Sequence, residues 1–176
     1  MFRSLRTGFL ALFMVGSLLV AGSAVSAATS TATLTAGTLS ITAAPANFSY
    51  PSTALTGDII NLTSSFVTSV NDATGSKAGW NLQGVVTVLT DAGSDTIPAV
   101  GHTFSGVTIS GTTGTSPTNN IALGQIPTTA AKIFNATANT GKGKSTETFA
   151  TALAVPADTA AGTYTATLTV TIVSGP

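Results

Sequence analysis

The stretch G-T-Y-T-A-T-L-T-V-T-I-V at residues 162–173 decides the fold class, because its apolar and hydroxyl residues alternate strictly. One face carries Tyr164, Ala166, Leu168, Val170 and Ile172, and the other carries the threonines. A period of two in β-branched residue types is typical of a half-buried strand, whereas the apolar stripe of a helix repeats about every three to four residues. The Pro, Asp and Gly of residues 155–162 favour a loop before this strand. The sequence therefore predicts that the chain ends in an antiparallel pair of strands, residues 146–155 and 162–173.

Further alternating or β-branched runs, separated by turn signals, extend this pattern over the chain. They lie at residues 31–42, 59–70, 80–90, 97–100 and 104–110. Residues 121–126 and 131–137 are weaker candidates, and residues 130–138 are also compatible with a short helix. Short strands without a long amphipathic helix predict an all-β fold, an Ig-like or Greek-key β-sandwich of two antiparallel sheets.

The N-terminus has the tripartite order of a secretory signal peptide. Arg3 and Arg6 precede an apolar run at residues 9–20, and small residues follow up to Ala27. The run is shorter than the roughly 20 residues that a membrane-spanning helix needs. We therefore expect a signal helix at residues 1–27 that is cleaved, no stable membrane anchor afterwards, and a single secreted domain at residues 28–176.

Composition narrows the possible partners of this domain. Charged residues make up only 7% of the chain, and after loss of Arg3 and Arg6 four lysines face six carboxylates, a net charge of minus two. This leaves no basic field for nucleic acid or anionic lipid. The chain has no cysteine, so we expect its cohesion to come from the core and the strand ladders without disulfides.

The motifs that suggest chemistry all have a simpler interpretation. Residues 138–145, A-N-T-G-K-G-K-S, fit a relaxed phosphate-binding loop, but the helix that such a loop requires is replaced by an alternating strand. Asp91 and Asp95 could contact calcium, yet two carboxylates are few for that ion and both residues suit a turn. His102 is the only histidine, and its glycine-rich surroundings predict a solvent-facing loop residue. No G-x-S-x-G elbow occurs. We therefore expect no enzyme, no cofactor and no metal site.

One constellation resembles a known family. The step Gly79-Trp80-Asn81-Leu82 is similar to the first signature of WxL-type cell-surface domains, and residues 36–41 and 161–169 resemble the two ends of those domains. The second Trp motif of the family is missing, since Val170 stands near its expected place. The resemblance implies an exported β-rich domain that associates non-covalently with peptidoglycan in the cell wall or with other surface proteins. It also implies Trp80, Asn81 and Leu82 as wall-binding residues.

Two alternatives remain beside this interpretation. Trp80 shares its face with Leu82, Val86 and Val88, which favours a core anchor over an exposed sugar-stacking platform. The threonine-rich final strand is also similar to the ends of spore-coat-U-like secreted proteins. This resemblance implies a structural subunit of a surface fibre or pilus that self-assembles by strand complementation, with residues 31–42 completing a neighbour's sheet. A small secreted hydrolase is a further class, but no residues support it.

Overall fold

The computed structural model describes residues 30–176, so the expected signal peptide at residues 1–27 lies outside the described residues. The compact folded unit comprises residues Thr35–Pro176. Its elements are β1 Leu39–Ala43, β2 Ile60–Asp72, β3 Trp80–Val86, β4 Leu89–Thr90, β5 Thr96–Ile97, the 3₁₀ turn η1 Ala99–Gly101, β6 His102–Gly114, β7 Ala131–Ala136, β8 Gly143–Val155 and β9 Leu168–Ser174. Within residues 30–176, no helix has the length and apolar character needed to cross a membrane.

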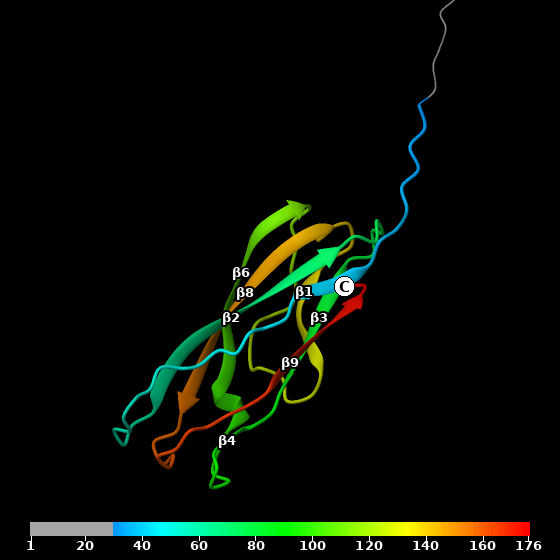
Figure 1. Cartoon of the computed structure of the whole chain (residues 1–176). Coiled ribbons are helices and arrows are strands. Elements are labelled where there is room, and N and C mark those ends of the chain that lie inside the picture. The colour runs from blue at the N-terminus through cyan, green and yellow to red at the C-terminus, as the bar shows by residue number, and fades with distance from the viewer. Residues whose placement is uncertain (1–29) are drawn as a thin grey trace, which may run out of the picture. The chain divides into compact units, whose positions relative to one another are not determined.

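The strands form two main antiparallel sheets (Figure 1). The four-stranded sheet has the order β1-β2-β8-β6, and the three-stranded sheet has the order β7-β3-β9. The short strands β4 and β5 pair with each other. The prediction of an all-β sandwich of two antiparallel sheets is therefore confirmed.

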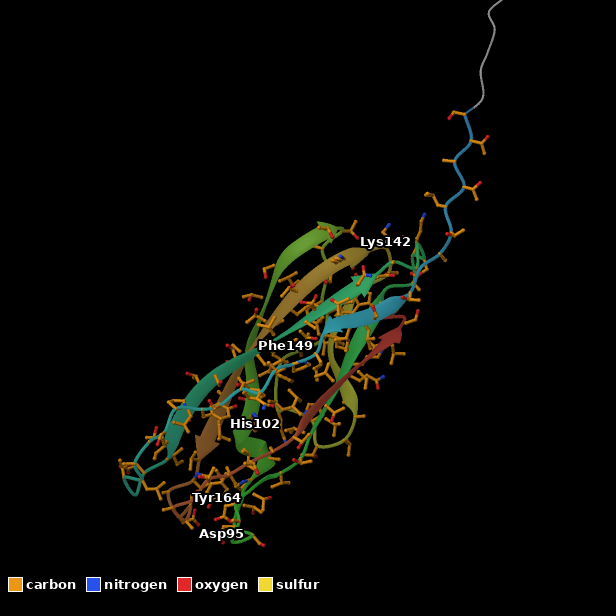
Figure 2. The ribbon with its side chains drawn as sticks, viewed as in Figure 1. Asp95, His102, Lys142, Phe149 and Tyr164 are labelled. Carbon is orange, nitrogen blue, oxygen red and sulfur yellow. The ribbon has the colours of Figure 1, made fainter. Side chains whose placement is uncertain are left out.

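Aromatic side chains from both sheets fill the space between them. Phe149 of β8 stacks on Phe66 of β2 with ring centroids 5.0 Å apart, and it meets Phe134 of β7 edge-on at 6.0 Å. Figure 2 shows Phe149 midway along the folded unit. The alternation in β8 turns every second residue inward, and this places Phe149 and Leu153 in the interior. A second, smaller apolar cluster contains Leu89, Ile97, Leu153 and Val155.

Several predicted strands match the structure, and others differ in extent. Residues 59–70 and 146–155 correspond to β2 and β8, and residues 131–136 are a strand, not a helix. The run at 31–42 is a strand only over Leu39–Ala43. The short piece predicted at 104–110 is part of a 13-residue strand, β6. Residues 80–90 divide into β3 and β4, and Val88 between them is 41% exposed and does not share the burial of Trp80.

The predicted terminal pair is wrong, because β8 and β9 belong to different sheets. Both edges of β8 are occupied by β2 and β6, so β9 pairs with β3 across the sandwich. Residues 162–167 make no ladder and form one isolated bridge, between Thr165 and Thr90. The predicted inward face of β9 is confirmed, since Leu168, Val170 and Ile172 pack against the core.

Candidate functional site

The Trp80 side chain lies wholly inside the sandwich. It is 0% exposed, and its indole Nε1–H donates a hydrogen bond to the backbone oxygen of Gly141 at 2.9 Å. Its ring packs on Phe134 with centroids 5.8 Å apart. The interpretation of Trp80 as a core anchor is confirmed.

The loop at residues 138–145 packs over the Trp80 side chain and accepts its hydrogen bond. Gly141 has φ +69°, and a Cβ at this position would lie 2.7 Å from the indole nitrogen of Trp80, so only glycine fits there. No helix follows the loop, because β8 begins at Gly143. The loop is therefore a turn that closes over Trp80, as its lack of a phosphate-binding context predicts.

Asn81 and Leu82 are buried as well. Asn81 Nδ2 donates a hydrogen bond to the backbone oxygen of Gly175 at 2.7 Å, while its Oδ1 has no partner among the described residues. In the ladder, Trp80 lies opposite Ser174 of β9. The W-x-L step thus ties β3 to the C-terminal strand, and none of its three side chains faces solvent.

The outer face of the four-stranded sheet is a continuous surface of small and hydroxyl residues. Cross-strand rows run over β2, β8 and β6, and they comprise Ser69–Thr146–Ser110, Val67–Thr148–Thr108, Ser65–Ala150–Gly106 and Thr63–Ala152–Thr103. Ser69 Oγ and Thr146 Oγ1 share a hydrogen bond of 3.0 Å. No charged side chain occurs in these four rows. The surface is therefore neutral and able to donate and accept hydrogen bonds.

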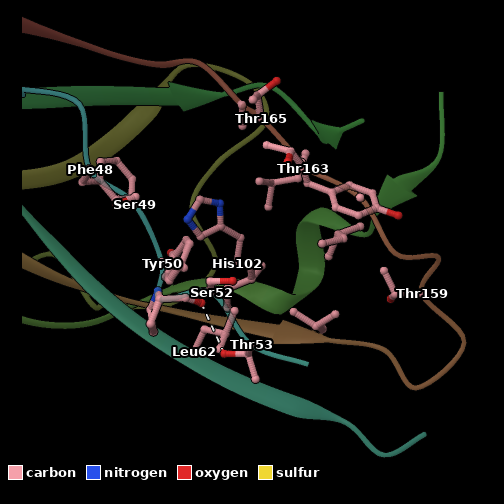
Figure 3. A pocket seen from close by; sticks show the side chains of 18 of the residues that line it. Phe48, Ser49, Tyr50, Ser52, Thr53, Leu62, His102, Thr159, Thr163 and Thr165 are labelled. Carbon is pink, nitrogen blue, oxygen red and sulfur yellow. Dashed lines mark hydrogen bonds between the residues drawn. The ribbon is translucent and has the colours of Figure 1, made fainter. Parts of the chain in front are cut away.

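A groove of about 970 Å³ lies between residues 45–55 and residues 159–168 (Figure 3). Aliphatic residues of the second cluster, such as Leu89 and Leu153, form part of its lining. Residues with hydroxyl side chains occur in both walls as well, and Figure 3 shows Ser52 and Thr53 on one wall and Thr163 and Thr165 on the other.

His102 lines this groove, so the prediction of a solvent-facing loop histidine is wrong. His102 is the first residue of β6 and lies opposite Leu153 of β8, which turns its ring inward. It is 3% exposed, and its Nε2 atom has no hydrogen-bond partner among the described residues. Burial lowers the pKa of His102 below its ordinary value, because the charged imidazolium is poorly solvated there. The imidazole is therefore neutral at pH 7.

Sequence reasoning missed Thr151 and Glu147, which are buried, and Tyr50, which is half-buried. Thr151 lies on the inward face of β8 beside this groove, and the Tyr50 ring meets the His102 ring edge-on at 5.8 Å. Glu147, also on β8, is 0% exposed and accepts a hydrogen bond from Ser145 Oγ at 2.6 Å. Burial raises the pKa of Glu147 to about 7.

Asp91 and Asp95 form a turn. The amide of Asp95 donates to Asp91 Oδ1 at 2.8 Å, and the amide of Asp91 donates to the Asp95 backbone oxygen at 3.0 Å. Figure 2 shows Asp95 at one end of the folded unit. Among residues 30–176, no group of three or more His, Cys, Asp or Glu side chains is placed to hold a metal ion.

We expect that a chelator leaves the thermal unfolding midpoint unchanged. The Asp91 carboxylate already accepts the amide of Asp95 within the turn, and calcium generally takes six to eight oxygen ligands. Calorimetry of the mature chain with and without EDTA measures this. A drop of several degrees in EDTA, absent in an Asp91→Asn variant, would instead identify a bound cation.

Comparisons with known proteins agree with the W-x-L step. A family model described as WxL domain surface cell wall-binding matches residues 23–176. No curated protein and no solved structure matches the chain. The match covers most of the chain, including the whole folded unit and the Trp80-to-Leu82 step. The chain therefore belongs to the WxL family of cell-surface, cell wall-binding domains.

Proposed function

We propose that the mature chain, residues 28–176, is exported and attaches non-covalently to the cell wall through the outer face of its four-stranded sheet. The observation that carries this proposal is the uncharged hydroxyl surface over β2, β8 and β6. Peptidoglycan glycans present hydroxyl and acetamido groups, which pair with hydroxyl side chains. Adjacent strands lie about 4.8 Å apart, so the rows offer a regular array of hydrogen-bonding groups.

Trp80, Asn81 and Leu82 contribute to this attachment by position. Their side chains are buried, so we propose that they hold β3 against β9 and do not touch the wall. The Trp80 hydrogen bond also anchors the loop that leads into β8, whose outer residues form the centre of the proposed surface.

We propose that the domain has no catalytic activity. His102 is buried among groove residues, and its Nε2 lacks a hydrogen-bond partner among the described residues, so no carboxylate orients it as a general base. Other surface proteins are the second class of partner that the family resemblance implies. The alternative of a fibre or pilus subunit assembled by strand complementation stays a prediction.

We expect the mature chain to co-sediment with purified Gram-positive-type cell walls, with little dependence on salt. The net charge of minus two gives a weak electrostatic contribution, so hydrogen bonds and apolar contacts carry the attachment. The measurement compares the bound fraction at low and at physiological ionic strength, with release of soluble wall fragments measured in parallel. A bound fraction that collapses with salt, or release of fragments, would contradict this proposal.

A pair of variants tests which surface binds. Thr148→Glu places a charge at the centre of the proposed face, and we expect it to weaken attachment about tenfold, or about 1.4 kcal/mol. Thr171→Glu places the same charge on an exposed position of β9 in the other sheet and serves as the control. Equal effects of both variants would place the wall contact elsewhere.

A further inference from the structure

One wall of the groove is extended backbone without strand partners. Within residues 30–176, no backbone–backbone hydrogen bond reaches residues 45–58. The side chain of Ser64 donates to the backbone oxygen of Ser49 at 2.8 Å, which holds this segment against β2. The amides of residues 46–50 have no hydrogen-bond partner among the described residues, and those of alternate residues share the edge that an added strand would meet.

The opposite wall has one paired and one unpaired edge. Thr165 exchanges backbone hydrogen bonds of 3.0 Å with Thr90, and the backbone oxygen of Thr167 accepts from Thr87 at 3.0 Å. Successive residues of an extended chain direct their backbone groups to opposite edges. The backbone groups of Tyr164 and Ala166 therefore point away from β4, and no backbone partner among the described residues meets them. An unpaired edge of this kind is a template for another strand.

The lining between these edges fits an uncharged chain with alternating side chains. No Asp, Glu, Lys or Arg lines the groove, and aliphatic side chains such as Leu62 and Leu153 line it between the two walls. A strand lying there would direct every second side chain to that apolar surface and the others outward. A saccharide, which carries hydroxyls around its whole ring, would leave many of them against aliphatic groups.

Three buried polar atoms beside the groove also lack partners. They are the Tyr50 hydroxyl, His102 Nε2 and Thr151 Oγ1, and of these the Tyr50 hydroxyl lies near Thr151 without the geometry of a hydrogen bond. A buried polar atom without a hydrogen bond is destabilising. Tyr50 and His102 line the groove, whereas Thr151 does not, so the unpartnered atoms of Tyr50 and His102 are the ones next to a strand inserted there.

We propose that the groove accepts residues 30–36 of a second copy of this chain as an added β-strand. This segment, S-T-A-T-L-T-A, carries no charge and places Ala32, Leu34 and Ala36 on one face and threonines on the other. It precedes β1 and forms no strand itself. The segment lies close to the end that signal cleavage would free, so it can enter a neighbour's groove. The inference gives the fibre-subunit alternative a site and does not rest on wall attachment.

Self-association of the mature chain tests this by analytical ultracentrifugation over a range of concentrations. We expect the weight-average mass to rise with concentration. Leu34→Asp should weaken association about tenfold or more, because it directs a charge to the apolar surface of the groove. Thr33→Asp adds the same charge on the opposite face, and we expect less than about a threefold change. Both substitutions lie outside the folded core, so folding is not at risk.

Ala166→Pro tests the groove side, because it removes the unpaired amide and should therefore weaken association. The melting temperature of the variant is measured alongside to check that it is folded. A synthetic peptide of residues 30–36 should compete with association of the unmodified chain. A chain that stays monomeric up to about 1 mM, or equal behaviour of Leu34→Asp and Thr33→Asp, overturns the proposal. If residues 30–36 are protected from hydrogen exchange in a monomer, the groove is occupied by the chain's own segment. If the NMR resonances of groove residues shift with a neutral oligosaccharide but not with the peptide, the groove is a glycan site. Each result overturns the proposal, and none affects the separate wall-binding measurement.

Discussion

Replacing Trp80 by alanine is expected to lower the free energy of unfolding by about 3 to 5 kcal/mol, the usual cost of emptying a buried aromatic site. Trp80 is 0% exposed and packs on Phe134, so the substitution removes the largest side chain of the core and leaves a cavity. It also leaves the backbone oxygen of Gly141 without its hydrogen bond. Loss of this hydrogen bond should loosen the loop at residues 138–145, which covers the Trp80 side chain.

Trp80→Phe is the matched control for this prediction. It keeps an aromatic ring in the core but removes the indole N–H, so we expect a loss of about 1 to 2 kcal/mol. Because Trp80 is the only tryptophan, unfolding in urea is followed by circular dichroism and not by fluorescence. If Trp80→Ala keeps its unfolding midpoint but loses wall binding, Trp80 acts as a surface ligand and the core interpretation is contradicted.

Alternation predicted the strands with one inward and one outward face. In β2 and β8, every second residue of a long run is buried or half-buried, so the period of two is visible in the sequence. In β6 it is not, because Gly106 and the residues around Gly111 interrupt it. The structure absorbs these interruptions as register shifts between Phe104 and Gly106 and between Ser110 and Thr113.

Alternation does not say which neighbour a strand pairs with. Residues 162–173 alternate throughout, yet only the part from Leu168 joins a ladder, and its partner is β3 and not the preceding strand. The pairing is decided by β2 and β6, which occupy both edges of β8. Those contacts are remote in sequence and leave no local signal.

The burial of two polar residues could be predicted from their positions along the strands, because residues two apart lie on the same face. His102 lies two residues before Phe104, and Glu147 lies two residues before Phe149, so each shares the inward face of its strand. The glycine beside His102 favoured a loop and hid this relation. The groove itself could not be predicted, because its walls come from residues 45–55 and 159–168, and only the closed sandwich brings them together.

Glu147 makes the stability of the domain depend on pH. Its carboxyl group is wholly buried on β8, and its Oε2 has no hydrogen-bond partner among the described residues. Burial raises the pKa to about 7 from an ordinary value of 4.5, and the hydrogen bond from Ser145 offsets only part of this effect. The protonated carboxyl group is therefore the form that the native structure favours.

We expect Glu147 to lower the free energy of unfolding by about 3 kcal/mol as pH rises from well below 4.5 to above 7. Below pH 4.5 Glu147 is protonated in both states, so its contribution is complete. Between these values the unfolded chain releases the proton that the native chain retains, and stability is lost until the native group also ionises. His102 acts in the opposite direction, because its lowered pKa means that stability is lost as pH falls below the ordinary value of 6.5.

Glu147→Gln separates the two effects at each pH. The amide keeps an oxygen that accepts from Ser145 Oγ and cannot ionise, so the variant should lie within about 1 kcal/mol of the unmodified chain at pH 5 and be more stable by about 2 to 3 kcal/mol at pH 8. Asp158→Asn removes an equal charge from an exposed position and controls for net charge. Urea unfolding at several pH values measures the difference. If the Glu147→Gln and unmodified curves stay parallel between pH 5 and 8, Glu147 does not retain its proton in the native state and the buried carboxyl is not the source of the pH dependence.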